Sequence, residues 1–164
     1  MKKCFIFLFL LLFSADLAAQ NIKVVDGDSL EIDGQRIRLD GIDAPEYKQI
    51  CKDATGKDYA CGQKALEFAQ NFIAQSEVDC QCLPEKDRYQ RELCECFVNE
   101  ESLNKALVTA GWAVPYRADE YSAAQKEARR YKRGIWQGKN MRPALYRILQ
   151  KHMEEDATYT DLLF

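Results

Sequence analysis

Apolar and polar residues alternate over short stretches near the start of the chain, which is the pattern of half-buried strands. Residues 21–25 (NIKVV), 29–32 (SLEI) and 35–41 (QRIRLDG) each show this alternation. The dipeptide Asp33-Gly34 separates the second stretch from the third, and such a pair is a strong signal for a two-residue hairpin turn. The pattern therefore predicts three consecutive short strands.

Three later stretches have helical spacing of their apolar residues. Residues 62–75 place alanine, leucine and phenylalanine side chains on one face of a predicted helix. Residues 101–110 predict a short helix that ends at Gly111, and residues 120–133 predict a more charged helix that ends at Gly134.

Two further strands are predicted around 77–83 and 92–98, joined by a polar loop, and the residues after Trp136 look partly helical. Five short strands with three helices favour an α+β fold, a five-stranded barrel of the oligonucleotide/oligosaccharide-binding (OB) type. Other α+β folds fit the same pattern. We expect one domain over residues 20–137 and a C-terminal tail over 138–164.

The first nineteen residues read as a secretory signal peptide. Lys2 and Lys3 precede an apolar run, CFIFLFLLLF, and small residues follow, with cleavage expected near Ala18 or Ala19. The alternative is an uncleaved membrane anchor, but the apolar run is short for a span. We expect an exported protein, periplasmic or extracellular, with no stable membrane anchor after cleavage.

Six cysteines remain after the leader, an even number that suggests disulfides in an oxidising compartment. On each of the two later strands a Cys-x-Cys pair faces one side, because side chains alternate. Antiparallel pairing of these strands predicts the bridges Cys80–Cys96 and Cys82–Cys94. A shifted register would leave one bridge and two free thiols, and four thiolates could instead hold zinc.

The remaining two cysteines flank the polar loop 47–60. A bridge between Cys51 and Cys61 would close this loop and brace the bend that precedes it.

The whole chain carries a net charge of −3, so contact with a polyanion would have to be local and supplied by a few arginines. The single histidine, His152, lies in the tail, which excludes a histidine-based metal site or a Ser-His-Asp triad in the domain. No Gly-rich phosphate loop of the Walker type is present. Carboxylates and arginines are therefore the candidate chemistry.

Asp28 and Asp43 can meet at one end of neighbouring strands if the first three strands form a meander. Two close carboxylates need a positive charge between them, and an all-oxygen pair suits a hard cation. The alternative is that the sequence DGD is only a turn. Arg38 and Arg91 could grip phosphate through their forked guanidinium groups, or could form ordinary surface ion pairs.

The segments VVDGDSLEI, IRLDGIDAPE and DRYQR, followed by LNKALVTAGWAVPY and RRYKRGIW, resemble the staphylococcal nuclease (thermonuclease) family. The resemblance runs from about Val24 to Trp136 and implies the OB-type barrel with three helices. It implies a secreted nuclease that needs Ca²⁺ and cleaves DNA and RNA, favouring flexible or single-stranded stretches, with little sequence preference and 3′-phosphate products.

The resemblance also assigns roles to individual positions. It implies that Asp28, Asp43 and the backbone carbonyl of Ala44 bind calcium, although the best-known member has threonine at the last of these. It implies that Glu46 is the general base and that two arginines hold the scissile phosphate, Arg38 and Arg91.

Three more residues would contact the nucleotide by the same resemblance, Arg88, Tyr89 and Tyr116. Gln90 stands where glycine is common in the family. Two other hypotheses remain: a catalytically silent module that binds oligonucleotide or another polyanion, and a structural role for a disulfide-bonded exported domain. A monomer is expected.

Overall fold

The structure is a computed structural model that describes residues 20–74, 76–117 and 119–161. The predicted signal peptide and its cleavage site lie outside the described residues. The strands of the main sheet are β1 (Ile22–Asp26), β2 (Ser29–Ile32), β3 (Gln35–Leu39), β7 (Asp79–Lys86), β8 (Glu92–Val98) and β9 (Glu101–Ser102). Two small pairs are β4 (Ile42–Asp43) with β10 (Val114–Pro115), and β5 (Cys51–Lys52) with β6 (Asp58–Tyr59). The helices are α1 (Cys61–Ile73), α2 (Leu103–Thr109), α3 (Ser122–Arg130), the 3₁₀ turn η1 (Gly134–Gln137) and α4 (Pro143–Asp161).

The main sheet confirms an α+β fold built on the five predicted strands. Its hydrogen-bonded order is β1-β2-β3-β8-β7, with β9 added beside β8. The sheet is mixed, because β3 and β8 run parallel while the other neighbours run antiparallel. In the described residues β1 and β7 stand at the two ends of this path, so its pairings leave the sheet open.

The β2–β3 turn is the two-residue hairpin that its sequence predicts. Ile32 pairs with Gln35, and the two residues between them have positive φ, 51° at Asp33 and 81° at Gly34. Both values match a type I′ turn, whose twist suits antiparallel strands. The turn fixes the register that places Ser29 opposite Arg38.

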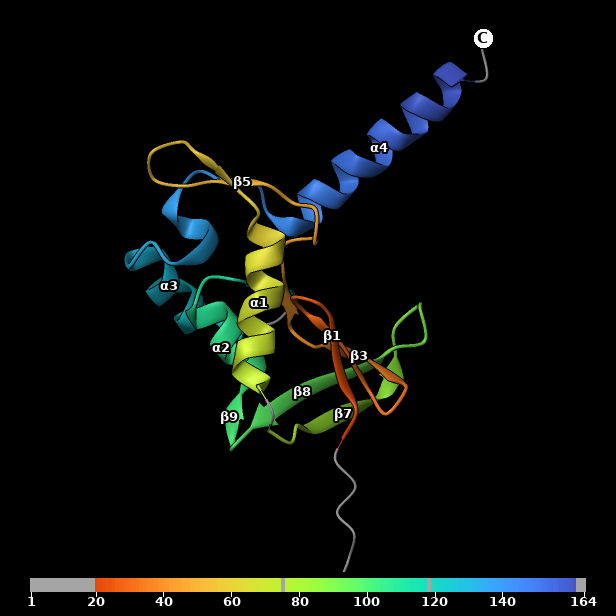
Figure 1. Ribbon diagram of the computed structural model, residues 1–164, viewed down its shortest axis with the longest axis vertical. Helices are drawn as coiled ribbons and strands as arrows, with labels where there is room; N and C mark the ends of the chain where they lie inside the picture. Colours follow the sequence, from red (N-terminus) through yellow and green to blue (C-terminus); the bar gives the residue numbers. More distant parts are fainter. Residues whose placement is uncertain (1–19, 75, 118, 162–164) are drawn as a thin grey trace, which may run out of the picture.

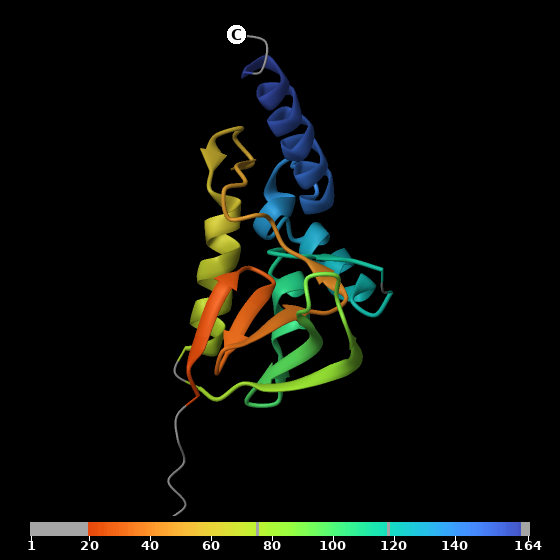
Figure 2. The same cartoon turned by 90° about the vertical axis from the view of Figure 1, so that its right-hand side faces the viewer.

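The core lies between the sheet and the helices α1 and α2 (Figures 1 and 2). Helix α1 buries Ala65, Ala69 and Ile73, spaced four residues apart on one face. Helix α2 is capped at its N-terminus by Ser102, whose side chain accepts a hydrogen bond from the backbone N–H of Lys105.

All three predicted disulfides are present: Cys51–Cys61, Cys80–Cys96 and Cys82–Cys94. The last two cross-link β7 and β8 in the predicted register, since the same residues are strand partners. The readings with free thiols or a four-thiolate zinc site are therefore wrong, because every one of these sulfurs is bonded to another.

The tail forms the long helix α4, which projects away from the body of the molecule (Figures 1 and 2). Its start is anchored. Pro143 is fully buried, and the buried side chain of Gln49 donates to the Met141 carbonyl at 3.0 Å. Among the helices of the described residues, none is long and apolar enough to cross a membrane.

Candidate functional site

The bend after β3 carries two carboxylates, those of Asp43 and Glu46, of which Glu46 lines the site pocket. Gly41 makes the turn with φ of 70°, a value that favours glycine. The next two residues form β4 and pair with β10, which places Val114 opposite Asp43. Asp43 is 1% exposed, whereas the Glu46 side chain is 34% exposed and reaches the pocket rim. The pairing of β4 with β10, a contact between distant segments, thus orients this bend.

The turn between β1 and β2 holds Asp28 against the same bend. The Ala44 backbone N–H donates to Asp28 Oδ2 at 2.8 Å, and the Leu39 N–H donates to the Asp28 carbonyl at 2.9 Å. The predicted meander therefore brings Asp28 and Asp43 together at one end of the sheet, and Asp28 is 4% exposed.

The guanidinium of Arg38 lies between these two carboxylates. It forms an ion pair with Asp28, and its second nitrogen donates to Asp43 Oδ1 at 3.2 Å and to the Ile42 carbonyl at 3.1 Å. Its side chain is 16% exposed, so the positive charge that the acidic pair requires is itself mostly buried.

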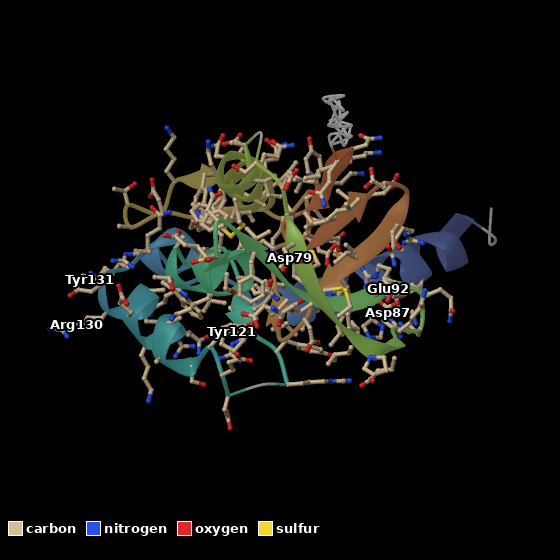
Figure 3. All side chains as sticks on the ribbon, turned by 90° about the horizontal axis from the view of Figure 1, so that it is seen from below. Asp79, Asp87, Glu92, Tyr121, Arg130 and Tyr131 are labelled. Atoms are coloured by element: carbon tan, nitrogen blue, oxygen red, sulfur yellow. A yellow bond between two sulfur atoms is a disulfide. The ribbon has the colours of Figure 1, made fainter. Side chains whose placement is uncertain are left out.

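Arg91 approaches the carboxylates from the β7–β8 loop. It pairs with Asp87 at 2.6 Å and donates to the Ser29 hydroxyl at 3.1 Å, and that hydroxyl donates to Asp28 Oδ1 at 3.2 Å. Figure 3 shows Asp87 beside the start of β8. In this loop Gln90 has φ of 63°, a left-handed conformation that favours glycine.

The predicted nucleotide contacts line the same pocket, which has a volume of about 680 Å³. Its lining includes Asp28, Ser29, Arg38, Glu46, Asp87 and Arg91 together with Arg88, Tyr89 and Tyr116, but not Asp43. The Tyr89 ring is 55% exposed and lies under the guanidinium groups of Arg88 at 4.7 Å and Arg91 at 5.5 Å. A second cavity, of about 760 Å³, is lined by acidic Glu77, Asp79 and Glu100 and would repel a polyanion.

Arg147 of α4 is a site residue that the sequence does not reveal. It donates to Glu46 Oε1 at 2.7 Å and to Asp43 Oδ1 at 2.8 Å. The pKa of its guanidinium is raised, because these two carboxylates outweigh the opposite effect of burial. Its position in the predicted helical tail carries no signal of this role, since the partners lie about a hundred residues away.

Burial disfavours the charged forms of two aspartates in this cluster. It raises the pKa of Asp26 to about 6, with the nearby charges of Asp28 and Glu46 adding to the shift against a hydrogen bond from the Gly27 N–H. It also raises the pKa of Asp28, while the Arg38 guanidinium opposes that shift. The carboxylates of Asp26, Asp28 and Glu46 therefore repel one another, and a nearby cation would relieve that repulsion.

The residues present fit a hard divalent cation with partial protein coordination. In the described part of the chain, no group of three or more His, Cys, Asp or Glu side chains could hold a metal ion by itself. Asp28 and Asp43 supply two carboxylates, and Asp43 Oδ2 is buried without a hydrogen-bond partner. Such an oxygen is a free ligand, and the remaining positions would fall to a backbone carbonyl and water.

The start of α1 supports the bend through Gly62, another residue that the sequence does not single out. A Cβ at this position would collide with the backbone carbonyl of Glu46. We expect Gly62→Ala to cost about 1–3 kcal/mol of unfolding free energy by overpacking and to displace Glu46. Denaturant unfolding measures this cost, and Gln63→Ala, on the exposed face of the same helix, is the matched control. Equal stability of the two variants would contradict the close contact.

Comparison with known proteins agrees with these motifs. The model of the family described as staphylococcal nuclease homologue matches residues 36–138, so Asp28 lies just ahead of the matched region. The succinoglycan biosynthesis protein ExoI of Rhizobium meliloti (strain 1021) is 36% identical, over 69% of this chain and 61% of its own length. The chain thus spans less than two thirds of that relative.

Two further relatives have names that refer to nucleases. An uncharacterized endonuclease of Escherichia coli O157:H7 is 32% identical over 74% of this chain and 78% of its own. The thermonuclease of Staphylococcus intermedius is 31% identical over 70% of this chain and 73% of its own.

Proposed function

The chain belongs to the staphylococcal nuclease homologue family, and on that basis we propose that it is a calcium-dependent nuclease that hydrolyses phosphodiester bonds of DNA and RNA. One observation carries the proposal: Arg38 and Arg91 line the same pocket as Asp28 and Glu46, and hydrogen bonds through Ser29 link Arg91 to the buried acidic pair. Two guanidinium groups beside a cluster of carboxylates are the groups that phosphoryl transfer requires.

Asp28, Asp43 and the Ala44 carbonyl would hold the calcium ion. Their oxygen atoms match the preference of calcium, and the replacement of threonine by Ala44 leaves a carbonyl ligand intact. The bound cation would neutralise the phosphate and lower the pKa of water.

Side chains of the protein would then transfer the proton and bind the phosphate. Glu46, half-exposed at the rim, would accept the proton of the attacking water. Arg38 and Arg91 would donate to the equatorial oxygens of the phosphate, an interaction that strengthens as negative charge develops. The products would be a 3′-phosphate and a free 5′-hydroxyl.

Exposed aromatic and basic residues at the rim support low sequence selectivity. Tyr89 and Tyr116 present ring faces beside Arg88 and Arg117, and every base can stack on such a ring. Stacking requires unstacked bases, so flexible or single-stranded DNA and RNA would be preferred. The chain would act as a monomer.

The finer description of the fold follows the family as well. We propose that the open path from β1 to β7 curls into the OB-type barrel, with α4 as an appended tail. Three disulfides suit an oxidising compartment, so the mature protein would be periplasmic or extracellular.

Removal of calcium tests the proposed function. We expect the purified mature chain to degrade plasmid DNA and RNA in calcium, to stop in EGTA, and to recover fully when calcium is restored, because the phosphate charge would otherwise be uncompensated. Gel electrophoresis follows the digestion, with EGTA saturated by calcium as the control. Digestion that continues in EGTA would remove calcium from the proposal.

Glu46→Gln separates the enzyme from the silent binding module. The amide keeps the shape of the side chain but accepts no proton, so we expect cleavage to fall by about 100-fold or more while nucleic-acid binding persists. Fluorescence anisotropy with a labelled oligonucleotide measures binding in the same samples. Binding by the wild type without any cleavage would favour the silent module.

A further inference from the structure

Arg147 places a positive charge on the carboxylates that the proposed function gives to calcium and to the general base. One guanidinium nitrogen is 2.7 Å from Glu46 Oε1 and the other is 2.8 Å from Asp43 Oδ1. Arg147 is 40% exposed, whereas the Asp43 side chain is 1% exposed. A charge carried by the tail therefore reaches from the surface onto a buried acidic group.

Apolar packing does little to hold α4 where Arg147 sits. Leu145, Ile148, Leu149 and Met153 are each 41–64% exposed, and the helix projects into solvent (Figures 1 and 2). Tyr146 adds a hydrogen bond to the Lys48 carbonyl at a long 3.4 Å. Among the described side chains of α4 beyond the anchor at Pro143, the two ion pairs of Arg147 are thus the strongest contacts with the body.

Asp43 already shares its Oδ1 between two guanidinium groups, those of Arg38 and Arg147. A divalent cation at Asp43 would add two more positive charges within a few ångströms of both. Repulsion at that range is strong in a half-buried site. The second partner of Arg38 is Asp28, whose side chain is 5% exposed, whereas the second partner of Arg147 is Glu46, which is 34% exposed, and Arg147 itself is 40% exposed. Arg147 is therefore the guanidinium group that can move toward solvent.

We infer that Arg147 is a built-in counter-ion that occupies Asp43 and Glu46 before the metal binds, so that calcium and the α4 helix compete for the same carboxylates. The inference rests on the proposed function for the role of these two groups as calcium ligand and general base. Competition of this kind is reciprocal: calcium loosens α4 from the body, and a docked α4 weakens calcium binding.

Calcium affinity and helix docking test this inference without nucleic acid. Calorimetric titration should give Arg147→Gln an affinity for calcium about 10- to 100-fold tighter than that of the wild type, because the competing charge is gone. Arg147→Lys keeps the positive charge but cannot bind both carboxylates through a guanidinium group, so its calcium affinity should lie between those of the wild type and Arg147→Gln. Lys151→Gln is the matched control one turn further along, since Lys151 is 76% exposed and pairs only with Glu155 among the described contacts.

Hydrogen exchange of the α4 amides gives a second, independent readout. Saturating calcium should speed exchange in residues 144–152 of the wild type, whereas Arg147→Gln should exchange fast with or without calcium. Equal calcium affinity of wild type and Arg147→Gln, or α4 exchange that ignores calcium in the wild type, would overturn the inference. So would a failure of both proteins to bind calcium.

These readouts also separate this inference from the proposed function. A protein that binds calcium and releases α4, yet cleaves nothing, would support the competition and refute the nuclease. A protein that cleaves nucleic acid only in calcium, but whose α4 amides exchange at the same rate with and without calcium, would support the nuclease and refute the competition.

Discussion

Arg91→Ala should lower the rate of phosphodiester cleavage by about 100- to 1,000-fold, the usual effect of removing one preorganised donor from a developing negative charge. Its effect on stability should be small. Arg91 donates to a neutral hydroxyl and pairs with Asp87, which is 16% exposed and keeps hydrogen bonds from the backbone N–H groups of Tyr89 and Arg91, so the loss of the Arg91 side chain should cost about 1–2 kcal/mol. The variant should thus remain folded and bind calcium while losing turnover.

Arg38→Ala should lose a similar factor in turnover but also destabilise the metal-free protein. Arg38 is a partner of two carboxylates that are 5% and 1% exposed, and removing one member of a buried ion pair costs about 3–5 kcal/mol. Calcium would replace the missing positive charge, so the loss of stability should shrink when calcium is added.

Steady-state cleavage of a labelled oligonucleotide and denaturant unfolding, each with and without calcium, distinguish these two arginines. Arg130→Ala serves as the charge-matched control, because Arg130 lies at the end of α3, far from Asp87 in Figure 3. Near-wild-type turnover in Arg91→Ala would refute the phosphate clamp. Equal stability of Arg38→Ala and Arg91→Ala without calcium would contradict the buried pairing of Arg38.

The parts of the fold that could be predicted have local causes. The dipeptide Asp33-Gly34 specifies its hairpin because both residues tolerate positive φ. The alternation of Cys80 with Cys82 predicts which side of the strand they share, and only one antiparallel register then pairs all four cysteines. Asp28 and Asp43 meet for the same reason, since a meander of short strands joins their ends.

The parts that could not be predicted depend on contacts between distant segments. Arg147 reaches Glu46 across 101 residues, and no spacing pattern in the tail indicates which body residues it faces. Gly62 reads as an ordinary residue of an amphipathic helix, and its importance appears only when the Glu46 carbonyl is seen against it. The parallel pairing of β3 with β8 is equally non-local, although it brings Arg91 to the end of the sheet where Asp28 lies.

Reduction of the three disulfides should remove most of the stability of the domain. The bridges span 10, 16 and 12 residues, and a loop of about 15 residues contributes about 3 kcal/mol in the chain-entropy description. Cys82–Cys94 lies inside the loop closed by Cys80–Cys96, so the second of this pair adds less than the first. The combined loss, about 5–7 kcal/mol, is comparable to the total stability of a typical small domain.

Denaturant unfolding before and after reduction and alkylation, followed by circular dichroism, measures this loss. The bridges can also be removed separately. Cys82→Ala with Cys94→Ala should cost little, because Cys80–Cys96 still ties the same two strands. Cys51→Ala with Cys61→Ala should cost the full amount for its loop and also reduce cleavage, because this bridge alone spans the segment between Glu46 and α1. A reduced protein that unfolds at the same denaturant concentration as the oxidised one would show that packing holds this fold without its cross-links.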